Sequence, residues 1–188
     1  MKSNVFIIHG SYGGPEDNWI PWLKSELEKL GIEVIAPLFP TPEGQSLDSW
    51  NQVFKPFEEK INSKSIFIGH SLGPAFILNL LEKVDVKITA SFFVAPFVSL
   101  LGNPDFDTIN STFFKQNFDW GKIKSHCNNF NVFYSDNDPY VPKAMSEFVA
   151  EKTSAHKFLI NNAGHFNTKA GYLKFEELWE KLEPLLDK

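Results

Sequence analysis

The alternation of short apolar runs with amphipathic stretches constrains the fold of this chain more than any other feature. Six runs have the length and character of buried strands, and they span residues 5–9, 33–37, 65–69, 89–94, 131–135 and 156–160. Other stretches place apolar side chains at helical spacing, and these predicted helices span residues 19–30, 46–61, 71–83, 143–151 and 172–186. Strands that alternate with helices predict a parallel sheet covered by helices on both faces.

The predicted architecture is a single α/β domain over residues 1–188. The chain has no internal repeat, low-complexity segment or linker-like stretch. Pro56 should kink or divide the helix predicted over residues 46–61. The connection from residue 95 to residue 130 is long enough for at most a partial cap over the sheet edge. We therefore expect three layers, doubly wound, with a mostly parallel six-stranded sheet and little or no lid.

Composition and charge narrow the range of partners and locations. The 18 basic side chains are all lysine, and the net charge of −5 argues against nucleic acid as a partner. No segment has the pattern of a signal peptide or a membrane span, and the single Cys127 excludes an intramolecular disulfide. We expect a cytoplasmic protein that associates with no membrane. Nineteen Phe and five Trp predict an aromatic-rich core.

The motif that carries chemistry is G-H-S-L-G at residues 69–73. It follows a predicted buried strand and precedes a predicted helix, which is the context that a nucleophilic serine requires. Such a turn holds Ser71 in a strained backbone conformation with positive φ. Residues two before and two after the serine approach their neighbours closely, so Gly69 and Gly73 fit where larger residues would not. The helix N-terminus behind Ser71 stabilises developing negative charge.

A serine nucleophile needs a base and a carboxylate that orients the base. Of five histidines, only His165 both follows a strand and lies late in the chain, whereas His70 is expected to point away from the nucleophile. Asp136 and Asp138 both follow the fifth predicted strand, and either one could serve as the acid. The expected oxyanion donors are the backbone N–H of Leu72 and a group from the glycine-rich loop 10–14, with Ser11 as the candidate.

Together, these motifs resemble the α/β-hydrolase superfamily. The residues that carry the resemblance are His9-Gly10, the 69–73 motif, Asp138 with Val141-Pro142, and Gly164-His165-Phe166. The opening stretch, residues 9–14 followed by Trp19, Trp22 and Leu23, is similar to small single-domain serine hydrolases of the YdeN-like and retinoblastoma-binding protein 9 family. The resemblance covers nearly the whole chain. It implies Ser71 as nucleophile, Asp138 rather than Asp136 as acid, and His165 as base.

The expected activity is hydrolysis of small or medium carboxylic esters, or related acyl compounds, through an acyl-enzyme and without a metal or cofactor. The candidate substrate-binding residues are aromatic: Tyr12, Phe97, Phe114, Tyr140 and Phe166. One alternative is a protein-interaction module on a hydrolase scaffold with weak activity. Another is a flavodoxin-like ligand-binding module, although loop 10–14 lacks the Lys-Ser/Thr ending of a phosphate-binding loop. Cys127, beside His126, is interpreted as a structural thiol.

Overall fold

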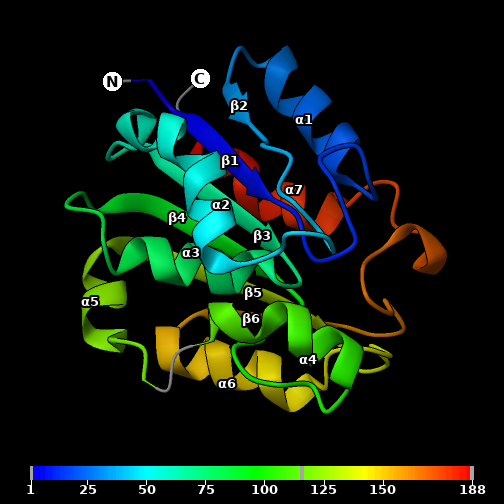
Figure 1. Ribbon diagram of the computed structural model, residues 1–188. Coiled ribbons are helices and arrows are strands. Elements are labelled where there is room, and N and C mark those ends of the chain that lie inside the picture. Colours follow the sequence, from blue (N-terminus) through cyan, green and yellow to red (C-terminus); the bar gives the residue numbers. More distant parts are fainter. Residues whose placement is uncertain (1, 115–116, 187–188) are drawn as a thin grey trace.

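The computed structural model describes residues 2–114 and 117–186, and its centre is one sheet (Figure 1). All six predicted strands form, in the order β2-β1-β3-β4-β5-β6, and every neighbouring pair is parallel. The strands are β1 (Asn4–Ile8), β2 (Glu33–Ile35), β3 (Ser65–His70), β4 (Ile88–Val94), β5 (Cys127–Ser135) and β6 (His156–Ile160). The sheet is thus wholly parallel, where the sequence predicted a mostly parallel one.

Seven α-helices accompany the sheet in the described residues. They are α1 (Ile20–Lys29), α2 (Leu47–Phe54), α3 (Gly73–Leu81), α4 (Pro104–Asn110), α5 (Trp120–Ser125), α6 (Lys143–Thr153) and α7 (Glu176–Leu182). Four 3₁₀ helices supplement them: η1 (Lys55–Lys60), η2 (Ser111–Phe113), η3 (Thr168–Ala170) and η4 (Glu183–Leu185). Pro56 divides the helix predicted over residues 46–61, as expected, because α2 ends at Phe54 and continues as η1.

Helices cover both faces of the sheet, so the fold has three layers (Figure 1). On β1, Phe6 and Ile8 face one apolar cluster, which includes residues of α2, α3, α5 and α6. Val5 and Ile7 face the opposite cluster, which includes residues of α1 and α7. Successive side chains of a strand point to opposite faces, which is why a continuous apolar run is required here.

Aromatic side chains fill much of the interior, as the composition predicted. The largest fully buried side chains are Trp19, Trp50, Phe6, Phe39, Phe54, Phe67, Phe76, Phe92, Phe93, Phe97, Phe113 and Phe133. Several of them pack ring against ring; for example, the centroids of Phe39 and Trp50 are 4.5 Å apart in a stacked pair. In the described part of the chain, no helix combines the length and apolarity needed to span a membrane.

The order of the strands creates one topological switch point. Strand β1 pairs with β2 on one side and with β3 on the other, so the direction of winding reverses between β1 and β3. Ligands of open parallel sheets bind beyond the carboxyl ends of the strands at such a point. The cap segment, residues 95–130, passes near this edge through α4 and η2. Its residues 115 and 116 lie outside the described residues.

Candidate active site

Ser71 lies at the turn between β3 and α3, beside the switch point. Its φ is 59°, in the left-handed region, and its N–H donates to the carbonyl oxygen of Val94 at 2.8 Å. A Cβ at Gly69 would lie 2.7 Å from the Pro74 nitrogen, and one at Gly73 would collide with the carbonyl oxygen of Ile8. The positive φ and both steric requirements agree with the sequence prediction.

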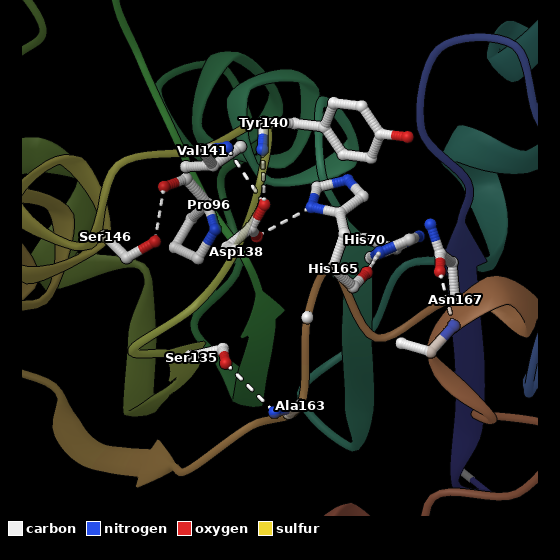
Figure 2. A network of polar contacts seen from close by, with 12 residues as sticks. His70, Pro96, Ser135, Asp138, Tyr140, Val141, Ser146, Ala163, His165 and Asn167 are labelled. Atoms are coloured by element: carbon white, nitrogen blue, oxygen red, sulfur yellow. Dashed lines mark hydrogen bonds and ion pairs between the residues drawn. The ribbon is translucent and has the colours of Figure 1, made fainter.

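Asp138 and His165 form a close pair at the same edge (Figure 2). The His165 Nδ1 and the Asp138 Oδ2 are 2.7 Å apart, and the side chains are only 10% and 2% exposed. The second carboxylate oxygen of Asp138 accepts hydrogen bonds from the N–H groups of Tyr140 at 2.9 Å and Val141 at 3.0 Å. The carboxylate is therefore held in place on one side while it orients the imidazole on the other.

The loop after β5 is tied to the loop after β6 by successive residues. Asp136 accepts from the N–H of Asn162 at 2.8 Å, and the Asn137 side-chain oxygen accepts from the N–H of Gly164 at 2.8 Å. Asp136 is exposed and contacts backbone, whereas Asp138 contacts the His165 ring. The sequence motifs alone left open which of the two aspartates pairs with His165. The structure distinguishes them, because Asp138 contacts the imidazole and Asp136 makes a contact that shapes the loop.

Ser71 and His165 line the same cavity. Among the described residues, no hydrogen bond joins the Ser71 hydroxyl to the His165 ring. Hydrogen bonds between catalytic groups are commonly long in the absence of substrate and shorten when it binds. The geometry therefore provides a serine, an imidazole and a buried carboxylate around one space, from three separate loops.

His70 is a member of this site that the sequence analysis underestimated. Its ring lies against the His165 ring, with centroids 4.9 Å apart, and it contacts Trp19 on another side. Its Nε2 is 2.9 Å from the carbonyl oxygen of His165, so the Nε2–H donates there (Figure 2). Burial, followed by the neighbouring His165, lowers the pKa of His70 to about 3. A neutral His70 thus supports the loop that carries His165.

His9 orients the loop that follows β1. Its Nδ1 donates to the carbonyl oxygen of Gly10 at 2.8 Å, and its Nε2 accepts from the N–H of Phe39 at 2.9 Å. Burial lowers the pKa of His9, which fits an imidazole that both donates and accepts. A Cβ at Gly10 would be 2.7 Å from the Cβ of Ser71, so only glycine allows this backbone to pass so close to the serine.

Two backbone N–H groups near Ser71 have no bonded acceptor in the described residues. Within residues 2–114 and 117–186, no acceptor is bonded to the N–H of Leu72 or the N–H of Ser11. Leu72 follows the serine, and Ser11 follows the glycine that touches it. A pair of preorganised donors near a nucleophile is the arrangement that stabilises an oxyanion.

The cavity has a volume of about 470 Å³ and an apolar side. Tyr12, Phe97 and Tyr140 line it, as predicted from the sequence. Leu101 and Phe106, from the cap segment, also line it, and the sequence analysis did not single them out. Phe106 contacts both tyrosines, with centroids 5.5 Å from Tyr12 and 6.0 Å from Tyr140.

Two predicted substrate-binding residues do not line this cavity. Phe166 has a φ of 50°, which turns its ring into the core, where it stacks on Phe175 at 5.2 Å. Phe114 packs edge-on against Phe97 at 5.5 Å, behind the cavity wall. Phe114 and Phe166, which the sequence analysis proposed as substrate contacts, therefore lie outside the lining of this cavity, because a position near the motifs does not fix where a ring points.

The opposite side of the cavity is polar. Its lining comes from two loops and consists of Asp17, Asn18, Asn167, Thr168 and Lys169. The two loops are joined because the Asn18 side-chain oxygen accepts from the N–H of Thr168 at 2.9 Å and lies 3.2 Å from its hydroxyl. The cavity thus joins an apolar side, contributed largely by the cap segment, to a polar rim.

Cys127 does not belong to the candidate active site. It is buried at the start of β5, 3.6 Å from the Ser91 hydroxyl, and burial raises the pKa of its thiol to about 11. A thiol in such surroundings is unreactive. In the described part of the chain, no group of three or more His, Cys, Asp or Glu side chains is arranged to hold a metal ion.

The fold and the arrangement at its switch point define the class of the protein: it is an α/β hydrolase. Solved structures agree on the fold. The crystal structure of the ydeN gene product from B. subtilis superposes with a TM-score of 0.91 at 24% identity and 98% coverage of both chains. The methylesterase MES16 from Arabidopsis gives a TM-score of 0.67 at 14% identity, with 96% of this chain and 99% of that chain covered.

Within that class, the chain belongs to the serine hydrolase family, whose sequence profile matches residues 5–184. Serine hydrolase RBBP9 of Rattus norvegicus is 28% identical over 190 residues, which cover 98% of this chain and 96% of the relative. YdeN of Bacillus subtilis (strain 168) is 25% identical over 190 residues, with coverage of 100% and 98%. These similarities confirm the family that the motifs indicated.

Proposed function

We propose that this chain hydrolyses small or medium carboxylic esters through an acyl-enzyme on Ser71. The observation that carries the proposal is the buried Asp138–His165 pair, at 2.7 Å, beside the cavity that Ser71 also lines. A serine hydroxyl is a poor nucleophile at neutral pH, and an adjacent oriented imidazole removes this obstacle. His165 is the base and Asp138 the group that orients it.

The reaction follows from these assignments. The Ser71 Oγ attacks the carbonyl carbon while its proton passes to the His165 Nε2, and the carbonyl oxygen becomes negative. The N–H groups of Leu72 and Ser11 stabilise that oxygen. His165 then gives its proton to the departing alkoxide, which leaves an acyl-Ser71. A water molecule, deprotonated by His165, then attacks the acyl carbon. His165 returns that proton to the Ser71 Oγ as the C–O bond breaks, which releases the acid and restores the free hydroxyl.

The cavity supports the proposed size and polarity of the substrate. A volume of about 470 Å³ is within the usual range for small-molecule sites. Phe97, Leu101 and Phe106 provide an apolar wall for the acyl chain. Tyr12 and Tyr140 also line the cavity, and the Tyr140 ring packs against the His165 ring with centroids 5.1 Å apart. The same chemistry also suits thioesters.

Labelling by a fluorophosphonate probe tests the proposal. Wild-type protein becomes labelled and hydrolyses p-nitrophenyl esters, and Ser71→Ala abolishes both. The matched control is Ser99→Ala, which removes an exposed serine outside the cavity and leaves both signals intact. Labelling of the Ser71→Ala protein at another residue contradicts the assignment of the nucleophile. A folded wild-type protein that is neither labelled nor active contradicts the proposed activity and favours an interaction module.

A further inference from the structure

A buried polar cluster connects the loop after β1 to the cap segment. The Ser11 hydroxyl donates to the side-chain oxygen of Asn110 at 2.7 Å. The Gln45 amide nitrogen donates to the same Asn110 oxygen at 2.7 Å and lies 3.1 Å from both the Ser11 hydroxyl and the Ile109 carbonyl oxygen. Asn110 is 1% exposed, Gln45 is 9% exposed, and Asn110 lines the cavity beside Ser71.

This cluster is costly to bury. The Asn110 Nδ2 and the Gln45 Oε1 are buried and have no hydrogen-bond partner among the described residues. Unsatisfied buried polar groups destabilise a fold, and an apolar side chain of similar shape would avoid that penalty. The value of the two amides must therefore lie in the hydrogen bonds that they do make, and both amides bond the Ser11 hydroxyl.

Ser11 also carries one of the two N–H groups near Ser71 that have no bonded acceptor among the described residues. The Gly10 carbonyl oxygen accepts from the His9 Nδ1 at 2.8 Å and from the N–H of Gly13 at 3.3 Å. In a trans peptide, the C=O and the N–H point in opposite directions. The N–H of Ser11 therefore points away from the buried His9 ring, and Gly10 and Ser11 both line the cavity.

We infer that Asn110, supported by Gln45, is a positioning residue that fixes the Gly10–Ser11 peptide so that its N–H stabilises the oxyanion. His9 holds the carbonyl end of that peptide, and Asn110 holds the Ser11 side chain at the other end. The inference rests on the proposed hydrolase function and assigns Asn110 no direct contact with the reacting atoms. Under this inference, α4, which ends at Asn110, helps to position the oxyanion donor in addition to covering the substrate.

Two substitutions at Asn110 distinguish the effect of its hydrogen bonds on kcat from the effect of its size and shape. Asn110→Leu keeps the approximate shape but removes the acceptor for Ser11 and Gln45. We expect kcat to fall by about 10- to 100-fold with KM changed by less than about threefold, because small misplacements of a catalytic group have effects of this size. Asn110→Asp keeps an acceptor for both donors and replaces the unpartnered NH2 by a second carboxyl oxygen. Burial favours the neutral, protonated carboxyl there, so kcat recovers to at least about tenfold above that of Asn110→Leu.

A control variant, Thr112→Val, and a further test variant, Ser11→Ala, distinguish a local effect on Ser11 from a general loosening of the cap segment. Thr112→Val removes the hydrogen bond from the Leu47 N–H, which also joins the cap segment to α2 but does not involve Ser11, and kcat stays near the wild-type value. Ser11→Ala retains the backbone N–H and removes the donor to Asn110, so it lowers kcat in the same way. In the double variant Ser11→Ala/Asn110→Leu, the losses in kcat are not additive, because both act on one contact.

The experiment measures kcat, KM and the inhibition constant of a trifluoromethyl ketone, which mimics the oxyanion, for all five variants and the wild type. The inhibitor should weaken in parallel with the fall in kcat. An unchanged kcat in Asn110→Leu, an equal loss in Thr112→Val, or additive losses in the double variant would overturn the inference. If Asn110→Leu does not fold, Ser11→Ala decides, and an unchanged kcat there overturns it. A wild-type protein without labelling or turnover refutes the proposed function instead.

Discussion

His9, His70 and His165 lie at one edge of the sheet in different surroundings. The His165 Nδ1 is hydrogen-bonded to the Asp138 carboxylate at 2.7 Å. His9 and His70 are buried, and burial lowers the pKa of each, to about 3 for His70. The two neutral rings donate to backbone carbonyls and so support the loops around Ser71.

The lowered pKa of His70 predicts a stability that declines in acid. Below pH 6.5, the unfolded chain binds a proton at this residue and the native protein does not, so the free energy of unfolding falls as the pH falls toward 3. The slope from His70 approaches about 1.4 kcal/mol per pH unit, and His9 acts in the same direction. Urea unfolding at several pH values measures it. His70→Gln should reduce the slope by one proton, and an unchanged slope would contradict the assignment.

Substitution of Asp138 and substitution of Asp136 should have very different effects on activity. Asp138→Asn preserves an oxygen for the N–H groups of Tyr140 and Val141 but no longer stabilises a protonated His165. We expect kcat for an ester to fall by about 10⁴-fold. Asp136→Asn keeps an acceptor for the Asn162 N–H and should change kcat little. Steady-state kinetics on the two purified variants compares them, and equal losses would show that the loop, not the charge of Asp138, matters.

Sequence patterns located the residues whose neighbours in the chain define their surroundings. Ser71 was found because its strand, glycines and helix are contiguous, and His165 because it follows a strand late in the chain. Asn110 and Phe106 were not singled out, since their importance comes from contacts with loops distant in the sequence. Phe166 follows His165 in the chain but does not line the cavity, because its ring is buried in the core against Phe175.

At the scale of elements, the strands were predicted well and the ends of some elements were not. Strand β5 begins at Cys127, earlier than predicted, because pairing with β4 holds Asn129 opposite Ala90 although asparagine is unfavourable in strands. The last predicted helix, 172–186, contains α7 only from Glu176 to Leu182, and η4 (Glu183–Leu185), which contains Pro184, follows it. Tertiary pairing and a proline thus override local periodicity.

Because α3 and β1 are in close contact at Gly73, a single methyl group added there should lower the stability of the fold. Gly73→Ala places a Cβ against the carbonyl oxygen of Ile8 in the middle of the fold. We expect the free energy of unfolding to fall by about 1–3 kcal/mol, because neither backbone can move freely. Denaturant unfolding measures this change. Gly121→Ala in α5 is the control, where the nearest atom is a side-chain oxygen at 3.4 Å and alanine is expected to be neutral or stabilising.

At the scale of the whole molecule, the switch point explains why distant residues meet. The carboxyl ends of β1, β3, β5 and β6 lead into the loops that carry Ser11, Ser71, Asp138 and His165. The strand order could be restricted from the sequence by the handedness of crossovers, and the edge that holds the site follows from it. The course of the cap segment could not be predicted, because α4 and η2 are short and have no strong periodicity.

The cap segment should determine which acyl chains are accepted. Phe106 bridges Tyr12 and Tyr140 over the cavity, so Phe106→Ala opens the apolar side while the groups around Ser71 remain. We expect the ratio of kcat/KM for octanoyl over acetyl p-nitrophenyl esters to rise about tenfold, which corresponds to roughly two more buried methylenes at about 0.8 kcal/mol each. Phe148→Ala, at an exposed phenylalanine outside this cavity, should leave the ratio unchanged. If the ratio is the same in wild type and Phe106→Ala, the acyl chain lies elsewhere, and the polar rim formed by the loops of Asn18 and Thr168 becomes the next surface to vary.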